Sequence, residues 1–304
     1  MTFRRVAFFV VGALAVCLNA ACSIQGLAID RIGDSLAASG STFSADDDPE
    51  LIRAAAPFSL KLTENLLAER PQHAGLLLAA ARGFTQFAYA FVQQDADALE
   101  SSDVAAAFAQ RDRARRLYLR ARGYGLRALH VAHPGTETRW RSDIASALAV
   151  TGAADVPALY WTGAAWAGAI ALSKDTPEAV ADLPIVSAML DRALTLEPGF
   201  GDGALHTLMI TLSMARSDLP DGTARARQHF AAALRLSHGQ QVSPYLALAE
   251  AVALPGQDRA EFTALLKQAL AIDADANPAQ RLENRILQGR ARWLQGRVDD
   301  LFLE

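Results

Sequence analysis

Cysteine is almost absent from this sequence, which has only Cys17 and Cys22 among its 304 residues. If a leader of 21 residues is removed, one cysteine remains and no intramolecular disulfide can form. Two apolar runs, Val6–Val16 and the uncharged stretch 158–172, are both shorter than the ~17–20 residues that a membrane-spanning helix needs. The sequence therefore favours neither a disulfide framework nor a spanning helix in either run.

Motifs for catalysis are also missing. The sequence has no GxSxG, no Walker lysine loop and no HExxH. His130 and His133 lie one helical turn apart, but no acid or cysteine completes a metal set, so we interpret them as part of a helix end. The glycines of 199–203 follow a predicted helix and not a strand, which argues against a nucleotide loop. We expect no enzyme activity, no metal and no cofactor.

Aromatic residues make up only 7% of the chain, and runs rich in Val, Ile, Thr and Tyr are few. Alanine and leucine dominate, so helix propensity is high and strand propensity low almost throughout. The predicted class is all-α. Removal of the leader takes away Arg4 and Arg5 and moves the formal net charge from −4 to −6, with 27 basic against 33 acidic side chains. Mild acidity together with export makes nucleic acid an unexpected partner.

The first residues have the pattern of an export signal. Arg4 and Arg5 precede the apolar run, and Ala20 and Ala21 precede Cys22. The segment 18–23 resembles a lipobox, although Asn19 stands where an aliphatic residue is usual. We predict a signal peptide (1–21), a lipid on Cys22 with a following loop (22–48), and a helical-repeat domain (49–304). The alternative is an ordinary signal peptide that leaves an incidental cysteine.

The stretch 39–57 predicts a loop followed by a helix start. Gly, Ser and the run Asp46–Asp48 are typical of a loop, Asp48 suits a helix cap, and Pro49 suits a first turn. We expect helix formation to resume at Glu50. The three aspartates lack the spacing and glycine of a calcium loop, so we interpret them as a cap and a solvated loop.

Similar helix ends recur along the chain, each with an apolar or small residue, a Leu, and then a Pro or a turn. Counted from Leu66, Ala128, Ala193, Ala233 and Ala269, the intervals are 62, 65, 40 and 36 residues. The last two approach the 34-residue tetratricopeptide period. We predict a helical-repeat array of degenerate tetratricopeptide-like helix pairs. A non-repetitive bundle whose helices end alike is the alternative.

Two segments could line a cavity or an interface. The stretch 158–172 is a predicted buried helix, with glycine and alanine recurring every four residues beside Tyr160, Trp161 and Trp166. The second segment, 83–91, places aromatic residues at helical spacing. Plain core packing is the alternative for both. The cavity candidates are Phe84, Phe87, Tyr89, Phe91, Tyr160, Trp161 and Trp166.

Residues 111–127 contain seven arginines and one acid, Asp112. In an otherwise acidic chain this is a local basic patch, and docking of an acidic partner or an anionic lipid is one interpretation. The other is a solvated helix face whose charges pair locally. Arg113, Arg116 and Arg120 are the candidate docking residues.

Several of these segments together resemble the TatT family, the lipoprotein component associated with tripartite ATP-independent periplasmic (TRAP) transporters. The resemblance is carried by residues 36–91, by LYWTGAAWAGAIALSKD, by the arginine-rich helix and by ALTLEPGFGDGALH. It implies a helical lipoprotein with cryptic tetratricopeptide repeats that forms a trimer and binds a periplasmic substrate-binding protein. Apolar or amphipathic small molecules would pass through a cavity or pore.

We therefore expect a non-enzymatic transport accessory on the periplasmic face of the outer membrane. Ser23 supports that membrane because it is not the Asp that favours inner-membrane retention. The alternative is an envelope assembly scaffold whose repeats bind peptides or outer-membrane partners without a small molecule.

Overall fold

The computed structural model describes residues 31, 33–35, 40–136 and 138–302. The predicted signal peptide and Cys22 lie outside these residues. No strand occurs in the described part of the chain, and helices account for nearly all of its regular structure. The all-α prediction is confirmed.

The helices follow one another with short connections. The long ones are α3 (Pro49–Glu69), α4 (Ala74–Phe87), α6 (Val104–Ala132), α9 (Val156–Ala171), α11 (Leu183–Leu196), α12 (Ala204–Ala215), α13 (Gly222–Leu236), α15 (Arg259–Ala271) and α16 (Arg281–Gln295). The short ones are α2 (Gly40–Ser44), α5 (Gln94–Leu99), α7 (Arg139–Ser142), α8 (Ile144–Ala149), α10 (Pro177–Val180), α14 (Ser243–Leu248) and α17 (Val298–Leu301). Two π-helical segments, η1 (Ala88–Gln93) and η4 (Ala249–Ala253), and three 3-10 turns, η2 (Ala153–Asp155), η3 (Phe200–Gly203) and η5 (Pro278–Gln280), complete the described chain.

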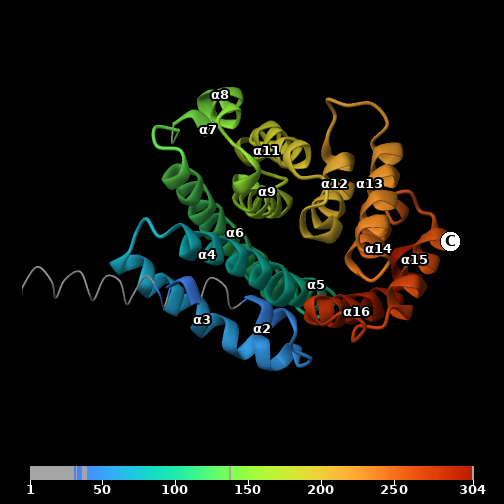
Figure 1. The fold of residues 1–304 in the computed structure, drawn as a ribbon. Coiled ribbons are helices and arrows are strands. Elements are labelled where there is room, and N and C mark those ends of the chain that lie inside the picture. The colour runs from blue at the N-terminus through green and yellow to red at the C-terminus, as the bar shows by residue number, and fades with distance from the viewer. Residues whose placement is uncertain (1–30, 32, 36–39, 137, 303–304) are drawn as a thin grey trace, which may run out of the picture.

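The helices form a curved array that closes on itself (Figure 1). Each element packs mainly on its neighbours, from α3 and α4 through α6, α9, α11, α12 and α14 to α15 and α16. The last helix, α16, then contacts α2 and α3, and Arg281 Nη1 donates a hydrogen bond to the carbonyl oxygen of Ala45 at 2.9 Å. The first and last parts of the described chain therefore meet, and the array is a ring.

The five predicted helix ends coincide with the ends of α3, α6, α11, α13 and α15. Four of their alanines are buried in the core, as close packing against a neighbouring helix requires: Ala128, Ala193, Ala233 and Ala269. Helix pairs with buried alanines are compatible with a degenerate repeat, but the repeat itself stays a prediction.

Helix α3 begins where the sequence predicts. The Asp48 side chain accepts hydrogen bonds from the backbone N–H groups of Glu50 and Leu51, both at 3.0 Å. The loop predicted before it is wrong in part, because Gly40–Ser44 form helix α2. That short helix contacts α16 and η5, and Phe43 packs on the core. Tertiary contacts stabilise this helix, since five residues hardly form a helix alone.

The predicted buried helix is α9, and its glycines allow neighbouring helices to come close. A Cβ added at Gly168 would lie 2.8 Å from the Tyr118 ring of α6, and one at Gly163 would lie 2.7 Å from Leu190 of α11. Gly125 of α6 faces Thr162 of α9 in the same way. The small-residue face therefore serves helix packing on two sides of α9.

Residues Ala74–Leu99 form one continuous helical run that is apolar and long enough to cross a membrane by length and composition. More than half of its most apolar window is buried inside the fold. Leu76 and Leu77 are fully buried in a core cluster shared with α3 and α6. We therefore interpret this run as a core helix of the ring.

Candidate functional site

The predicted phenylalanine stripe lies in the core. Phe84, Phe87 and Phe91 are buried, and Phe84 stacks on Tyr124 of α6 with ring centroids 5.9 Å apart. Arg120 lies over Phe84 at 5.0 Å, which adds a cation–π contact. The stripe thus packs α4 against α6, which agrees with the core-packing interpretation.

Tyr89 and Tyr160 are placed differently from these phenylalanines. Tyr89 is 38% exposed and Tyr160 is half-buried, yet burial raises the pKa of both hydroxyls. Carboxylates of distant helices also act on them: Glu250 of η4 on Tyr89, and Glu283 of α16 on both tyrosines. Because the carboxylate of Glu283 acts on both hydroxyls, we interpret the two tyrosines as facing α16 across the interior of the ring.

Tyr160 extends an apolar surface along α9. Its ring contacts Trp161 and Phe200, with centroids 4.9 Å and 5.1 Å apart. Ala164 and Ala167 follow on the same helical face and are half-buried, and Ala171 is exposed. Tyr160 and Ala167 are partly buried against the core cluster that α9 shares with α11 and α12, and Ala171 lines the groove described below.

Beside Tyr89, a chain of ion pairs joins the two ends of the ring. Arg290 Nε of α16 lies 2.8 Å from Glu250 Oε1, and Arg290 Nη1 lies 3.0 Å from Asp97 Oδ2 of α5. Arg111 Nη2 of α6 contacts Asp97 Oδ1 at 3.2 Å and Glu100 Oε2 at 2.7 Å. Each guanidinium in this chain has two carboxylates. We call Glu250, Arg290, Asp97, Arg111 and Glu100 the closing network.

The arginines of α6 divide between two opposite faces of the helix, because successive residues are about 100° apart. The predicted docking residues point one way: Arg120 pairs with Glu64 of α3 at 2.5 Å, Arg116 pairs with Asp112, and Arg113 hydrogen-bonds Gln110. Arg111, Arg115 and Arg122 lie along the other face. All three remain exposed, and Arg120 in addition joins α6 to α3.

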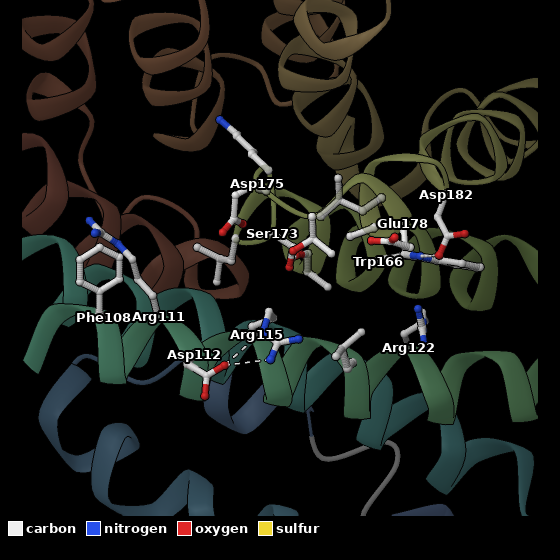
Figure 2. Close-up of a pocket in the computed structure, with 18 of the residues that line it drawn as sticks. Phe108, Arg111, Asp112, Arg115, Arg122, Trp166, Ser173, Asp175, Glu178 and Asp182 are labelled. Atoms are coloured by element: carbon white, nitrogen blue, oxygen red, sulfur yellow. Dashed lines mark hydrogen bonds and ion pairs between the residues drawn. The ribbon is translucent and has the colours of Figure 1, made fainter. Parts of the chain in front are cut away.

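A groove of about 780 Å³ runs between this second face of α6 and the segment from α9 to α10 (Figure 2). One end is marked by Phe108 and Arg111, the other by Arg122, Trp166 and Asp182. Leu119, Ala169, Ile170 and Leu172 supply an apolar wall, and Lys174, Asp175 and Glu178 are exposed residues of the lining. Glu178 lies beside Trp166 and Asp182 (Figure 2).

Trp166, a predicted cavity residue, is 2% exposed and forms the inner end of this groove. Its indole Nε1 donates to Asp182 Oδ2 at 3.1 Å, and Arg141 Nη2 donates to the same oxygen at 2.6 Å. The guanidinium groups of Arg122 and Arg141 lie 4.8 Å and 5.7 Å from the indole ring centre. The sequence reasoning missed Arg122, Arg141 and Asp182, although the 3.6-residue period already separates Arg122 from the docking set.

Among the described residues, no group of three His, Cys, Asp or Glu side chains could hold a metal. His133 Nε2 lies 2.9 Å from Asp155 Oδ2, which ties the end of α6 to η2. Residues 199–203 form the turn between α11 and α12, where Gly201 and Gly203 adopt positive φ angles of 61° and 101°. Glycine suits these positions because they are left-handed.

These features define a class of protein: an all-α ring with a tyrosine-bearing interior and a separate charged groove. Residues 45–302 match the TRAP transporter T-component family, and the chain belongs to that family. A curated relative, described as an uncharacterized protein of Treponema pallidum (strain Nichols), is 32% identical over 322 residues, which cover 99% of this chain and 98% of the relative. The resemblance seen in the sequence is confirmed. The family is a transporter accessory component and not an enzyme family.

Proposed function

We propose that this protein is a periplasm-facing lipoprotein accessory of a TRAP-type transport system. It docks a substrate-binding protein and binds an apolar or amphipathic small molecule inside its ring. Membership of the T-component family supports the transport role. The observation that carries the ligand-binding part is the pair Tyr89 and Tyr160, which are surrounded by protein and yet exposed.

The interior suits an amphipathic molecule because its two sides differ chemically. The Tyr160 face of α9 offers the tyrosine ring and the half-buried Ala164 and Ala167, which favour apolar contact. Glu250 and Arg290 of the closing network lie near Tyr89 on the other side and offer charged groups. A ligand could bury an apolar body on α9 and keep a polar end at the network.

The substrate-binding protein docks, in this proposal, through the exposed basic face of α6. Arg113 and Arg116 are exposed there, and in the described part of the chain Arg116 pairs with Asp112 of its own helix alone. Acidic side chains on the partner would compete with Asp112 and form ion pairs with the guanidinium groups. Arg120 would orient this face, because its pair with Glu64 holds α6 against α3.

The homotrimer forms, in this proposal, through an apolar stripe on α3. Leu51, Phe58 and Leu62 are 56%, 74% and 37% exposed. Their spacing of seven and four residues places them on one face of the helix. Three large apolar side chains on one exposed helical face are typical of a protein contact surface. The anchor for the assembly is a lipid on Cys22, at the periplasmic face of the outer membrane.

The first test uses the chain that begins after Cys22. Light scattering measures its mass alone and after mixing with periplasmic extract, and mass spectrometry identifies co-eluting proteins and extracted small molecules. The proposal expects a trimer that retains a TRAP substrate-binding protein. A monomer that retains no such protein but captures peptide segments would instead favour an envelope assembly scaffold.

Filling the interior tests the ligand-binding part. Ala167→Trp on the Tyr160 face of α9 should abolish the recovery of apolar molecules and leave partner docking intact. Ala231→Trp on the exposed side of α13 is the matched control. Equal ligand recovery from both variants would contradict ligand binding in the interior of the ring.

Replacement of one residue tests the trimer surface. Phe58→Glu should give a monomer in light scattering, with unchanged helix content by circular dichroism. Val150→Glu, a change at an apolar residue that is 51% exposed after α8, should remain trimeric. A trimeric Phe58→Glu protein would contradict this placement.

A further inference from the structure

We propose that the substrate-binding protein docks through an acidic helix, which lies along α6 and presents carboxylates at heptad spacing. The surface that receives it is one exposed stripe of α6, which we call the α6 ridge: Ala105, Ala109, Arg113, Arg116, Arg120, Gly123 and Arg127. The inference rests on the docking proposed above and names the structure that the partner brings to it.

The α6 ridge forms a straight seam on the helix surface. From Ala109 to Arg127 its residues are separated by alternating steps of four and three. This heptad spacing is the one that keeps a row of residues facing a second helix alongside. At about 100° per residue, the buried Ala114 and Tyr118 of α6 lie on another side of the helix, where α4 and α9 pack. The exposed seam therefore fits a helix better than an irregular surface.

Three arginines of the α6 ridge are held over aromatic rings. The pairs, with the distances from the guanidinium carbon to the ring centroid, are Arg113 on Phe87 (6.0 Å), Arg120 on Phe84 (5.0 Å) and Arg127 on Tyr124 (5.5 Å). Successive members lie seven residues apart, which is about 10.5 Å along a helix. A guanidinium that already lies on a ring loses less freedom when a carboxylate binds its edge. Acidic residues at the same heptad interval on a partner helix would meet each of them.

The carboxylates that contact the α6 ridge do not neutralise it, because each is shared between two cations. The pairs are Arg115 and Arg116 with Asp112, and Lys61 and Arg120 with Glu64. Two carboxylates therefore face four cations. In a chain whose formal net charge is −4, this local excess of positive charge favours an acidic partner.

The first and last arginines of the α6 ridge have neutral partners. Arg113 donates to Gln110 Oε1 at 3.4 Å, and Arg127 Nη2 donates to the carbonyl oxygen of Pro71 at 2.8 Å. In the described part of the chain, neither of these two arginines pairs with a carboxylate. Both can therefore bind a partner's carboxylate without breaking an ion pair.

Gly123 marks the place where a partner helix can come closest. It is exposed within a helix of 29 residues, where glycine is less stable than alanine. A Cβ at this position would have no atom within 4 Å, so packing in the described structure does not require a glycine here. Together with Ala105 and Ala109, it keeps the α6 ridge low between the arginines and lets another backbone approach.

A lipid surface is the other polyanion that could cover basic residues, and the position of the exposed apolar side chains argues against it. Leu51, Phe58 and Leu62 are the exposed large apolar residues of α3. They lie on the other side of α3 from Glu64, which faces the α6 ridge. A flat membrane on the ridge would leave these side chains out of the bilayer, whereas a helix needs only the ridge.

The test compares two fluorophore-labelled helical peptides of about three heptads, each rich in alanine. One peptide carries glutamate at the a and d positions of every heptad. The other has the same composition with its glutamates distributed around the helix. Fluorescence anisotropy with the chain that begins after Cys22 should show about tenfold tighter binding of the first peptide. Equal affinities would overturn the proposal, because they would mean that only net charge is recognised.

Variants of the α6 ridge test the same binding with matched controls. Arg113→Gln and Arg127→Gln should each weaken the heptad peptide about threefold to fivefold. Arg292→Gln, at an exposed arginine of α16, should leave its affinity unchanged. Gly123→Leu should weaken binding because its side chain fills the ridge. Gly289→Leu, at an exposed glycine of α16 that also has no atom within 4 Å of an added Cβ, should not.

Co-elution with periplasmic extract separates failure of this proposal from failure of the proposed function. The substrate-binding protein should be retained by the unmodified chain and by Gly289→Leu but lost from Gly123→Leu. Equal retention by all three would overturn docking on the α6 ridge and leave the transport role in place. Absence of the protein from all three would overturn the docking on which the inference rests. Preferred binding to phosphatidylglycerol vesicles, weakened by Arg113→Gln, would overturn the proposal in favour of a membrane contact.

Discussion

The ring is held together by two contacts of opposite character. The contact between α6 and α9 contains no ion pair at its closest points, where Gly125 meets Thr162 and Gly168 meets Tyr118. The contact between the ends of the ring depends on the closing network, in which Arg290 joins Asp97 and Glu250. Close packing between helices leaves no room for added atoms, whereas a half-buried ion pair that loses one member can be partly solvated.

The comparison implies that the two contacts fail differently. An added side chain in the α6–α9 contact must separate two long helices and disturb the core clusters beside them. Loss of one carboxylate in the closing network leaves the other contacts of α16 in place, including the hydrogen bond of Arg281 to Ala45. Opening of the ring should therefore begin between its ends.

The largest expected effect comes from Gly125→Val. A Cβ at this position would overlap the hydroxyl of Thr162 and lie 3.2 Å from its backbone Cα, so α9 itself must move. We expect a loss of about 3 kcal/mol in the free energy of unfolding, measured by urea titration. Gly123→Val, on the exposed side of the same helix with no atom within 4 Å, should change stability little. Equal losses in the two variants would contradict the close-packing argument.

A third contact, between α12 and α13, is polar but uncharged and adds a pH dependence. His206 Nδ1 and His229 Nδ1 lie 2.9 Å apart, and burial together with His206 lowers the pKa of His229 to about 4. His229 binds a proton near pH 6.5 in the unfolded chain but only near pH 4 in the folded chain. The free energy of unfolding is therefore highest above pH 6.5 and falls as the pH is lowered toward 4.

The expected size of this loss is about 2–3 kcal/mol, from ~1.4 kcal/mol for each pKa unit. Urea titrations at several pH values between 7 and 4 would measure this loss in the free energy of unfolding. His229→Phe should flatten the dependence in this window. His238→Asn removes an exposed histidine and should keep the full slope. A His229→Phe protein with an unchanged slope would show that other groups cause the loss.

A smaller effect is expected from Asp97→Asn, which weakens the closing network. Asp97 is 21% exposed and contacts both Arg290 and Arg111, each of which keeps one other carboxylate. We expect a loss of about 1–2 kcal/mol and faster hydrogen exchange in α16. Asp299→Asn breaks the exposed pair with Arg259 and should cost less than about 0.5 kcal/mol. Unchanged hydrogen exchange in α16 would show that the closing network does not hold the ends of the ring together.

The smallest effect is a gain. Gly123→Ala should stabilise the protein by up to about 1 kcal/mol, because alanine favours an exposed helical position over glycine. Gly125→Ala, two residues away, should lose stability for the steric reason given above. Thermal unfolding of the two variants side by side measures the contrast, and the same sign for both would refute it.

Much of the helical architecture follows from local sequence signals. The start of α3 follows from Asp48, Pro49 and Glu50, and the ends of five helices follow from one recurring pattern. The burial of α9 follows from its lack of charge. These features depend on capping, periodicity and hydrophobicity over a few residues, which a sequence displays directly.

The candidate site was less predictable. Tyr89 and Phe91 are two residues apart, but Phe91 lies in the core and Tyr89 faces the interior, because η1 presents them on different sides. Arg120 and Arg122 are also two residues apart; one pairs with Glu64, and the other has no ion pair in the described structure. Residue type alone could not separate the members of either pair.

The sequence by itself therefore determined that this protein is helical, where α3 begins, where five of the helices end, and which family it resembles. Only the tertiary structure decided that the ring closes through α16, that α2 is a helix, and that Arg120, but not Arg122, forms an ion pair within the described residues. The physical reason is the range of the forces involved. Caps and helix periods act between residues a few positions apart. The contacts that close the ring join residues as distant as Ala45 and Arg281.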